Sequence, residues 1–171
     1  TTIYLREGKY VLDKPLMLTS DDGNDSKELI IKNYPGEKTV LSSGIVLDLK
    51  WEKYKNGIMR AVVKGSPVMD MLFVNGELKS MARYPNYDEK AVRFNGTSAL
   101  ATAPERVKKW KCPEGGYLHA MHKHDWGDFH YRITGKNEKG ELQLEGGWQN
   151  NRPMGIHNEN RMVENIFEEL D

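Results

Sequence analysis

The stretch Thr2-Ile3-Tyr4-Leu5-Arg6-Glu7-Gly8-Lys9-Tyr10-Val11-Leu12 decides the fold of the first part of the chain. Its two short apolar runs, residues 3–5 and 10–12, are separated by the turn formers Glu7-Gly8. Short apolar runs bounded by Gly, Pro, Asp or Asn are typical of strands joined by turns. Further runs of this kind follow at residues 16–18, 29–31, 40–41 and 45–47. The first 48 residues are therefore predicted to form a series of short strands.

Two parts of this segment, residues 3–19 and 28–47, match in character. Each supplies about three short strands at bends, which is the content of one coil of a parallel β-helix. The inward apolar side chains of one coil stack on those of its neighbours, so a coil cannot bury its core alone. An antiparallel meander would show a similar alternation, and the pattern of two coils does not separate the two folds.

Composition excludes several classes of protein. The chain has 171 residues, and its 25 Lys and Arg balance its 25 Asp and Glu, which gives no electrostatic footprint for nucleic acid or an anionic membrane. No apolar run approaches the roughly 20 residues that cross a bilayer, so no membrane span is expected. The single cysteine, Cys112, excludes an internal disulfide framework and a zinc site with several cysteines.

The ends of the sequence lack the usual signals. Thr1-Thr2-Ile3-Tyr4-Leu5 has neither an initiator Met nor a targeting segment, and residues 161–171 stop without a terminating signal. We therefore expect an internal segment of a longer protein, with a complete small domain as the alternative.

The character of the sequence changes near residue 49. Asn56-Gly57 and Asn75-Gly76 each separate two apolar runs, which is a strong short-range signal for a β-hairpin. A third hairpin is expected from residues 129–133 through 137–140 to 142–144. Three hairpins within about 100 residues predict a compact antiparallel domain.

Two stretches look helical. In residues 102–110, Thr102 is a candidate N-cap and Glu105 would complete a capping box, with Pro104 tolerated in the first turn. In residues 159–170, four apolar residues share one face at helical spacing: Met162, Ile166, Phe167 and Leu170. We predict a helix for this second stretch, with a strand at residues 163–167 as the alternative.

Several stretches together resemble the N-terminal part of bacterial right-handed parallel β-helix proteins related to glycoside hydrolase family 141. They are residues 2–10, Asn33-Tyr34-Pro35-Gly36-Glu37, residues 72–77, Ala82-Arg83-Tyr84-Pro85-Asn86-Tyr87-Asp88 and Trp148-Gln149-Asn150-Asn151-Arg152-Pro153. Their order and spacing match across nearly the whole chain. The opening pattern is shared by many β-helix proteins, whereas the stretches around Arg83 and Trp148 are more specific.

The resemblance implies the organisation of the chain. Residues 1–48 would be the first coils of a right-handed parallel β-helix. Residues 49–158 would be a small antiparallel β-rich insertion domain with one or two short helices, and residues 159–171 would return toward the β-helix. The chain would then be mainly β, and its partner would be the remainder of the parent β-helix.

The resemblance also implies a carbohydrate-active enzyme that is secreted to the periplasm or cell surface of a bacterium. Hydrolysis of a glycosidic bond usually needs two carboxyl groups that flank it. In β-helix glycosidases these acids usually project from later coils, so the sequence nominates no catalytic pair. We expect a glycoside hydrolase acting on a complex polysaccharide, and the isolated segment to be inactive. The alternatives are a non-catalytic carbohydrate-binding or spacer module and a polysaccharide lyase on the same scaffold.

Residues 117–130 are the richest in chemistry, because four of the five histidines lie there. In an extended strand His119 and His122 point to opposite faces. A zinc site built from His122, His124 and either Asp128 or His130 would need a bend at Gly127, and neither an HExxH motif nor a cysteine pair is present. The sequence therefore predicts no metal site and no cofactor. Asp125 and Asp128 are interpreted as parts of an exposed turn.

The same region is a candidate carbohydrate site. Trp side chains can stack on the apolar face of a sugar, while imidazole, amide and guanidinium groups hydrogen bond to hydroxyls. The candidate substrate-binding residues are His119, His122, Trp126, Trp148, Asn150, Arg152 and Arg83. The structural alternative is that the tryptophans pack inside the insertion domain and the polar groups satisfy turns. For Arg83, the alternative is an anchor that holds the insertion domain to the β-helix by binding backbone carbonyls or a carboxylate.

Overall fold

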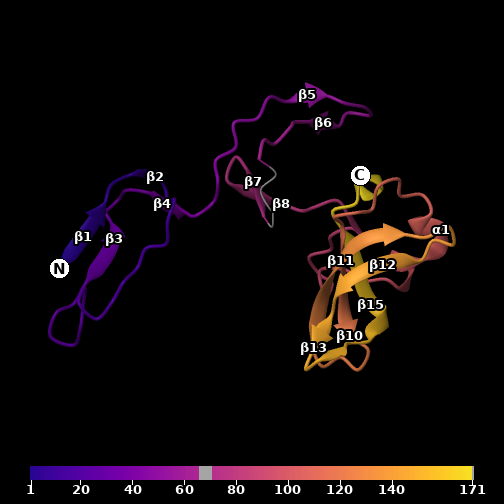
Figure 1. The fold of residues 1–171 in the computed structure, drawn as a ribbon. Coiled ribbons are helices and arrows are strands. Elements are labelled where there is room, and N and C mark those ends of the chain that lie inside the picture. The colour runs from indigo at the N-terminus through magenta and orange to yellow at the C-terminus, as the bar shows by residue number, and fades with distance from the viewer. Residues whose placement is uncertain (66–70, 171) are drawn as a thin grey trace. The chain divides into compact units, whose positions relative to one another are not determined.

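The computed structural model describes residues 1–65 and 71–170 (Figure 1). Residues 66–70, in the predicted insertion domain, and Asp171, at the end of the predicted return segment, lie outside the described residues. Backbone contacts divide the chain into two compact units, Thr1–Val68 and Met69–Asp171. Each unit is described by itself.

Parallel strand pairs build the beginning of the first unit. Strand β1 (Thr2–Leu5) pairs in parallel with β3 (Ile30–Asn33), and β2 (Gly8–Val11) pairs in parallel with β4 (Thr39–Ser42). Four of the predicted strands are thus confirmed, and the antiparallel meander is wrong for this segment. The parallel pairing ends at Ser42, and the next paired strands are antiparallel.

The predicted strands at residues 16–18 and 45–47 are wrong, because neither run is paired in the structure. Local hydrogen bonds turn the backbone next to each run. The Asp22 carboxylate accepts from the Thr19 N–H at 2.8 Å, and the Ser42 hydroxyl accepts from the Gly44 N–H at 3.2 Å. Turns of this kind satisfy the backbone locally and compete with a strand ladder.

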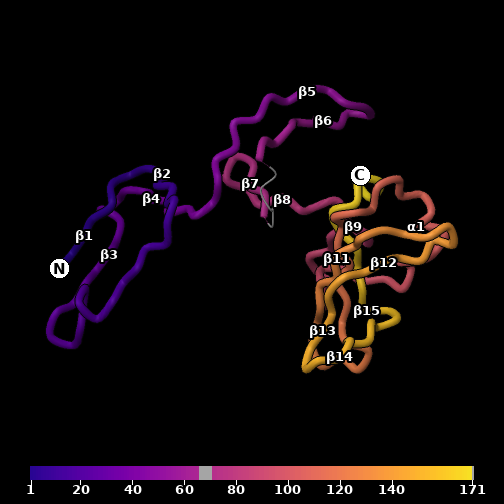
Figure 2. The backbone as a smooth tube through the Cα atoms, viewed as in Figure 1, coloured from indigo at the N-terminus to yellow at the C-terminus, as the bar shows by residue number. Residues whose placement is uncertain are grey.

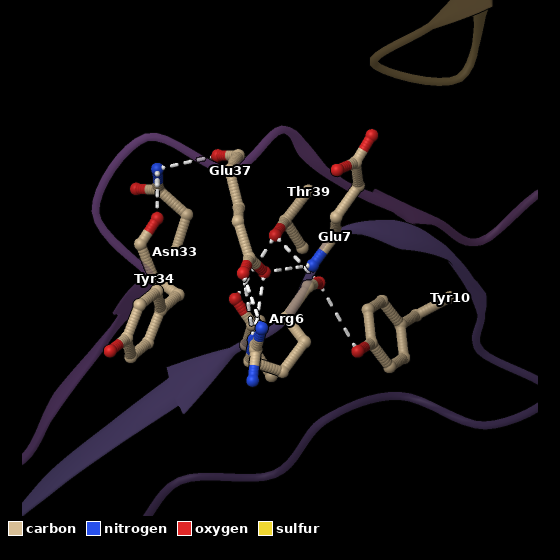
Figure 3. Close-up of polar contacts among 8 residues, drawn as sticks. Arg6, Glu7, Tyr10, Asn33, Tyr34, Glu37 and Thr39 are labelled. Carbon is tan, nitrogen blue, oxygen red and sulfur yellow. Dashed lines mark hydrogen bonds and ion pairs between the residues drawn. The ribbon is translucent and has the colours of Figure 1, made fainter.

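A polar corner holds the two parallel pairs in register (Figure 3). The Glu37 carboxylate accepts hydrogen bonds from the Arg6 guanidinium at 2.6 Å and from the Glu7 backbone N–H at 2.6 Å. Thr39 Oγ1 donates to the carbonyls of Leu5 and Arg6. The corner between β1 and β2 is therefore bonded directly to the corner between β3 and β4.

No residue among the described residues 1–65 is buried. Apolar side chains of the paired strands, such as Ile3 and Leu41, remain nearly half exposed. Two stacked rungs supply one apolar layer and no second layer to cover it. The first unit therefore has defined strand pairing without a core of its own.

Two short hairpins confirm the Asn-Gly predictions (Figure 2). Strands β5 (Glu52–Lys53) and β6 (Met59–Arg60) form the first, and β7 (Leu72–Val74) and β8 (Glu77–Lys79) form the second. Both Asn-Gly pairs have positive φ at both residues, as a type I′ turn requires.

A five-stranded antiparallel sheet dominates the second unit, with strand order β12-β11-β10-β15-β9 (Figure 1). The strands are β12 (Leu142–Gly146), β11 (Asp128–Lys136), β10 (Tyr117–His122), β15 (Ile156–Glu164) and β9 (Arg83–Tyr84). The hairpin of β11 and β12 confirms the third predicted hairpin.

One face of this sheet carries the core. Burial alternates along β10 and β11, as it does in a sheet with one covered face. The buried face packs with η1 (Ala99–Thr102), α1 (Pro104–Val107) and the following Trp110. The buried residues of this core are Ala101, Val107, Trp110, Leu118, Ala120, Tyr131, Ile133, Val163 and Ile166. The opposite face is more polar and carries His119, His130 and Arg132, together with the buried Met162.

The predicted helix near residue 104 is confirmed, but its predicted cap is wrong. Thr102 is the last residue of η1, and Ala103 is the N-cap of α1 without a side-chain hydrogen bond. The side-chain cap lies earlier, because Ser98 Oγ accepts from the Leu100 N–H at 3.1 Å. None of the helices in the described residues has the length and apolar character of a membrane span.

The predicted helix at residues 159–170 is wrong. Its first half, residues 159–164, belongs to β15, which pairs with β10 on one side and with β9 on the other, and a short 3-10 helix, η2 (Phe167–Glu169), follows. Met162 and Val163 are both buried, on opposite faces of a central strand. Phe167 and Leu170 are nearly half exposed, so the predicted apolar face of a helix does not exist.

A small hairpin of β13 (Trp148–Gln149) and β14 (Arg152–Pro153) is attached to the sheet by a glycine (Figure 2). Gly147 has φ +67°, and a Cβ at this position would lie 2.0 Å from the Tyr131 ring. The Tyr131 hydroxyl donates to the Met154 carbonyl at 3.2 Å, just beyond the hairpin. The core residue Tyr131 thus fixes both ends of the hairpin.

Candidate functional site

A tight turn between β10 and β11 gathers three of the aromatic and imidazole side chains. The N–H of His122 donates to the Gly127 carbonyl at 2.7 Å, and the Asp125 N–H donates to the His122 carbonyl at 2.8 Å. Asp125 has φ +58°, a conformation that Asp tolerates better than most residues. The turn brings the His122 ring parallel to the Trp126 indole, with centroids 4.9 Å apart and planes 14° apart.

The two rings differ in exposure. His122 is 5% exposed, whereas Trp126 is 74% exposed. The imidazole therefore covers one face of the indole, and most of the indole surface remains in contact with solvent. The His124 ring completes the group, 5.5 Å from His122 and 5.8 Å from Trp126. An indole held in this way is a rigid aromatic platform.

Positive charge surrounds this platform. Burial lowers the pKa of His122, and the neighbouring His124, Lys123 and Arg152 lower it further. The neutral imidazole is therefore favoured. Arg152 comes from β14, three residues before Gly155, where the backbone is joined to the turn. The backbone of Lys123 is held in place because its N–H donates to the Gly155 carbonyl at 2.9 Å.

The small hairpin separates its candidate residues. Gln149 is paired with Arg152 and Trp148 with Pro153, so Trp148 and Arg152 point to opposite sides of the ladder. Asn150 and Asn151 have positive φ and form the turn itself. Trp148 is 66% exposed. Arg152 and Trp148 therefore lie on opposite sides of the hairpin.

His119 lies on the opposite, polar face of the sheet. Its Nε2 is 2.8 Å from Glu164 Oε1, and its ring lies against His130 with centroids 3.6 Å apart. The hydrogen bond from His119 holds the pKa of Glu164 below its ordinary value, and the charges of His119, Arg83 and His130 act in the same direction. Glu164 was not a candidate, because only the strand register places it opposite β10.

Arg83 is a buried anchor, 8% exposed. Its guanidinium donates to the Pro85 carbonyl at 2.8 Å and to the Gly96 carbonyl at 2.9 Å, which holds together the two ends of the intervening loop. Burial lowers its pKa. The loop lines an open depression of about 690 Å³ together with Asn160. Arg83 thus binds backbone carbonyls within one loop of the second unit, and the predicted anchoring of the insertion domain to the β-helix stays a prediction.

Asp125 connects the turn to that loop. Its carboxylate accepts from Arg93 Nη1 at 2.6 Å and lies 3.8 Å from His157 Nε2. The Arg93 hydrogen bond lowers the pKa of Asp125. The one acid of the turn is therefore paired away from the platform.

The alternative zinc grouping does not form. His122 points to the buried face, whereas Asp128 and His130 lie on the polar face of β11. Within residues 1–65 and 71–170, no cluster of three His, Cys, Asp or Glu side chains is arranged to hold a metal ion.

Of the predicted site residues, the structure brings His122 and Trp126 into contact, and Arg152 lies on the small hairpin that joins the turn at Gly155. It places His119 on the other face, Arg83 in a buried anchor, and Trp148 and Asn150 on the small hairpin. Substrate contact by any of them stays a prediction.

Comparison with known proteins gives a likeness of fold. No protein-family model matches the sequence, and no curated protein matches it. A solved structure described as "Glycoside hydrolase" aligns with a TM-score of 0.64 and 24% sequence identity. The alignment covers 99% of this chain and 32% of that chain, so the chain spans about a third of the length of its structural neighbour. The chain therefore has a glycoside hydrolase-like fold.

Proposed function

We propose that the chain is the leading part of a carbohydrate-active β-helix protein, a glycoside hydrolase related to family 141 that acts on a complex polysaccharide. Residues 1–48 would be the first coils of a right-handed parallel β-helix, residues 49–158 the insertion domain and residues 159–171 the return segment. The observation that carries the proposal is the alignment of 99% of the chain with a glycoside hydrolase structure. The parallel pairing of β1 with β3 and of β2 with β4 supports the coils.

The catalytic acids would belong to the remainder of the parent protein, at the bacterial cell surface or in the periplasm. A glycosidase general acid needs a raised pKa to stay protonated. Among the described residues, every carboxyl group with a perturbed pKa is perturbed downward: Asp22, Glu37, Asp125 and Glu164. We assign this chain the role of contacting the glycan through the platform of Trp126 and His122, because the indole is stacked on the imidazole and remains 74% exposed.

The test is affinity electrophoresis of the 171-residue chain in gels that contain plant or bacterial polysaccharides. We expect at least one polysaccharide to retard the chain, and Trp126→Ala to weaken that retardation roughly tenfold, which corresponds to about 1.4 kcal/mol. Trp51→Ala is the matched control, because Trp51 is also an exposed tryptophan and lies in the first unit.

If no polysaccharide retards the chain, the carbohydrate-binding role is rejected. It is also rejected if wild type and Trp126→Ala are retarded equally. The same chain should release no reducing ends from a polysaccharide that it binds. Steady release would contradict the placement of the catalytic acids in the remainder of the parent protein.

A further inference from the structure

The basic side chains near Trp126 have no acid partner within the part of the chain that the structure describes. We define the basic patch as His122, Lys123, His124, Trp126 and Arg152. Among residues 1–65 and 71–170, no carboxylate forms an ion pair or hydrogen bond with the side chains of Lys123, His124 or Arg152. In a chain with no net charge, this is a local excess of positive charge.

The acids closest along the sequence are engaged elsewhere. Asp125 binds Arg93, and Asp128 lies on the polar face of the sheet, 4.0 Å from His130 Nε2. Every charged group that acts on His122 is positive: His124 and Lys123 from the turn, and Arg152 from β14. Like charges that are left together without a counter-ion raise the energy of the free protein, and an anion would relieve this cost.

The patch also has a surface that suits a sugar ring. The indole of Trp126 is stacked on His122 from one side and is 74% exposed. Lys123, His124 and Arg152 are exposed. The His124 ring lies 5.8 Å from the indole, Lys123 belongs to the same turn, and Arg152 lies three residues before Gly155, whose carbonyl accepts the Lys123 N–H. A sugar that stacks on the open face of the indole would place a substituent within reach of these cations.

We propose that the basic patch binds an anionic saccharide, with the ring stacked on Trp126 and its carboxylate or sulfate held by Arg152 and Lys123. This inference rests on the proposed function and specifies the class of sugar. Two permanent cations beside one aromatic ring fit a single acidic sugar. Nucleic acid binding typically rests on several phosphate contacts, and it is tested as a separate outcome.

The test is isothermal titration of the 171-residue chain with a hexamer of galacturonic acid and with the same hexamer fully methyl-esterified. The two probes share a backbone and differ in charge. We expect the acidic hexamer to bind at least tenfold more tightly than the esterified one. We also expect its affinity to fall when NaCl is raised from about 50 to about 500 mM. A sulfated galactan hexamer identifies sulfate as the source if it binds and the acidic hexamer does not. An oligothymidylate tests nucleic acid.

Charge substitutions locate the binding. Arg152→Gln should lower the affinity for the acidic hexamer about five- to tenfold and leave the affinity for the esterified hexamer unchanged. Arg152→Lys should retain most of the affinity. Lys139→Gln is the control, because it removes the same charge from the exposed β11–β12 turn, at the other end of β11. Thermal melts of each variant check that the second unit remains folded.

A second readout follows His122 itself. Because an anion favours the protonated imidazole, bound acidic hexamer should raise the pKa of His122 in an NMR titration, and the esterified hexamer should not.

The outcomes separate the two proposals. Equal binding of both galacturonate hexamers, or binding of neutral glycans alone, overturns the anionic class and leaves the carbohydrate function standing. Tighter binding of oligothymidylate than of any glycan, or an Arg152→Gln variant with wild-type affinity, overturns the patch. Absence of binding to every glycan overturns both.

Discussion

Single side chains set how the second unit responds to pH. Glu164 has a lowered pKa because His119 donates a hydrogen bond to it, so the folded state favours its ionised form. A carboxyl group with a lowered folded pKa stabilises the fold above its unfolded pKa of about 4.3, and this stability is lost as the pH falls through the folded pKa. We expect Glu164→Gln to lower the free energy of unfolding by about 1 kcal/mol at pH 6 and to flatten its decline below pH about 4.5.

Urea unfolding followed by tryptophan fluorescence, repeated between about pH 3 and pH 7, measures this effect. Glu145→Gln is the control, because Glu145 sits on β12 with an exposed side chain 3.8 Å from Arg132. Equal pH dependence of wild type and Glu164→Gln would contradict the assigned bond.

Residue type and strand period predicted part of the candidate site. His119 and His122 do point to opposite faces, as a period of two requires. His119 and Glu164 lie 45 positions apart in the sequence. Their contact depends on the register of β10 and β15, which no local pattern encodes. The proximity of Arg152 to His122 likewise depends on tertiary packing.

The attachment of the β13–β14 hairpin depends on Gly147. Its positive φ disfavours any side chain, and a Cβ would overlap the ring of the core residue Tyr131. We expect Gly147→Ala to destabilise the second unit by about 2 kcal/mol or more, since overpacking adds to backbone strain. The thermal melting temperature measures the loss.

Gly115→Ala separates strain from overlap. Gly115 has φ +87°, and a Cβ there would have no neighbour within 4 Å. Because a Cβ overlaps Tyr131 only at position 147, Gly147→Ala should be clearly the more destabilising of the two substitutions. Equal losses of stability would mean that backbone strain alone accounts for the effect.

The elements with local signals were the predictable ones. Asn56-Gly57 and Asn75-Gly76 specify type I′ turns, so their hairpins followed from two residues each. The prediction for residues 159–170 was wrong because four apolar residues there fit a helical period: Met162, Ile166, Phe167 and Leu170. In the structure, β15 is a central strand that buries residues on both faces. Apolar residues on both faces of a strand blur the period of two.

The two units differ in what holds them together. Every buried apolar residue of the described chain lies in the second unit, whereas residues 1–65 contain no buried residue. In native-state hydrogen exchange of the whole chain, we expect amides of β10, β11 and β15 to be protected on the order of a hundredfold more than amides of β1 to β4.

Equal protection of both groups of strands would contradict the absence of a core in the first unit. The comparison is internal to one sample, so it needs no variant.

The arrangement of the whole chain was predictable only in part. The alternating runs gave the strands of the first unit, but they did not distinguish parallel from antiparallel pairing, because pairing direction depends on contacts between distant residues. Leu16 and Ile45 lie in apolar runs like those of the paired strands and remain unpaired and exposed. The predicted boundary near residue 49, where Asn-Gly hairpins replace the earlier pattern, stays a prediction, and the backbone contacts divide the chain at Val68 and Met69.

The most direct test of the carbohydrate-contact role is NMR chemical-shift mapping of the whole chain during titration with the acidic hexamer. We predict that the Trp126 indole N–H, the amides of residues 122–127 and the Arg152 amide shift, while amides of the far turn at residues 137–141 do not. Shifts confined to other surfaces, or no shifts at saturating hexamer, would contradict the assignment of this surface to carbohydrate.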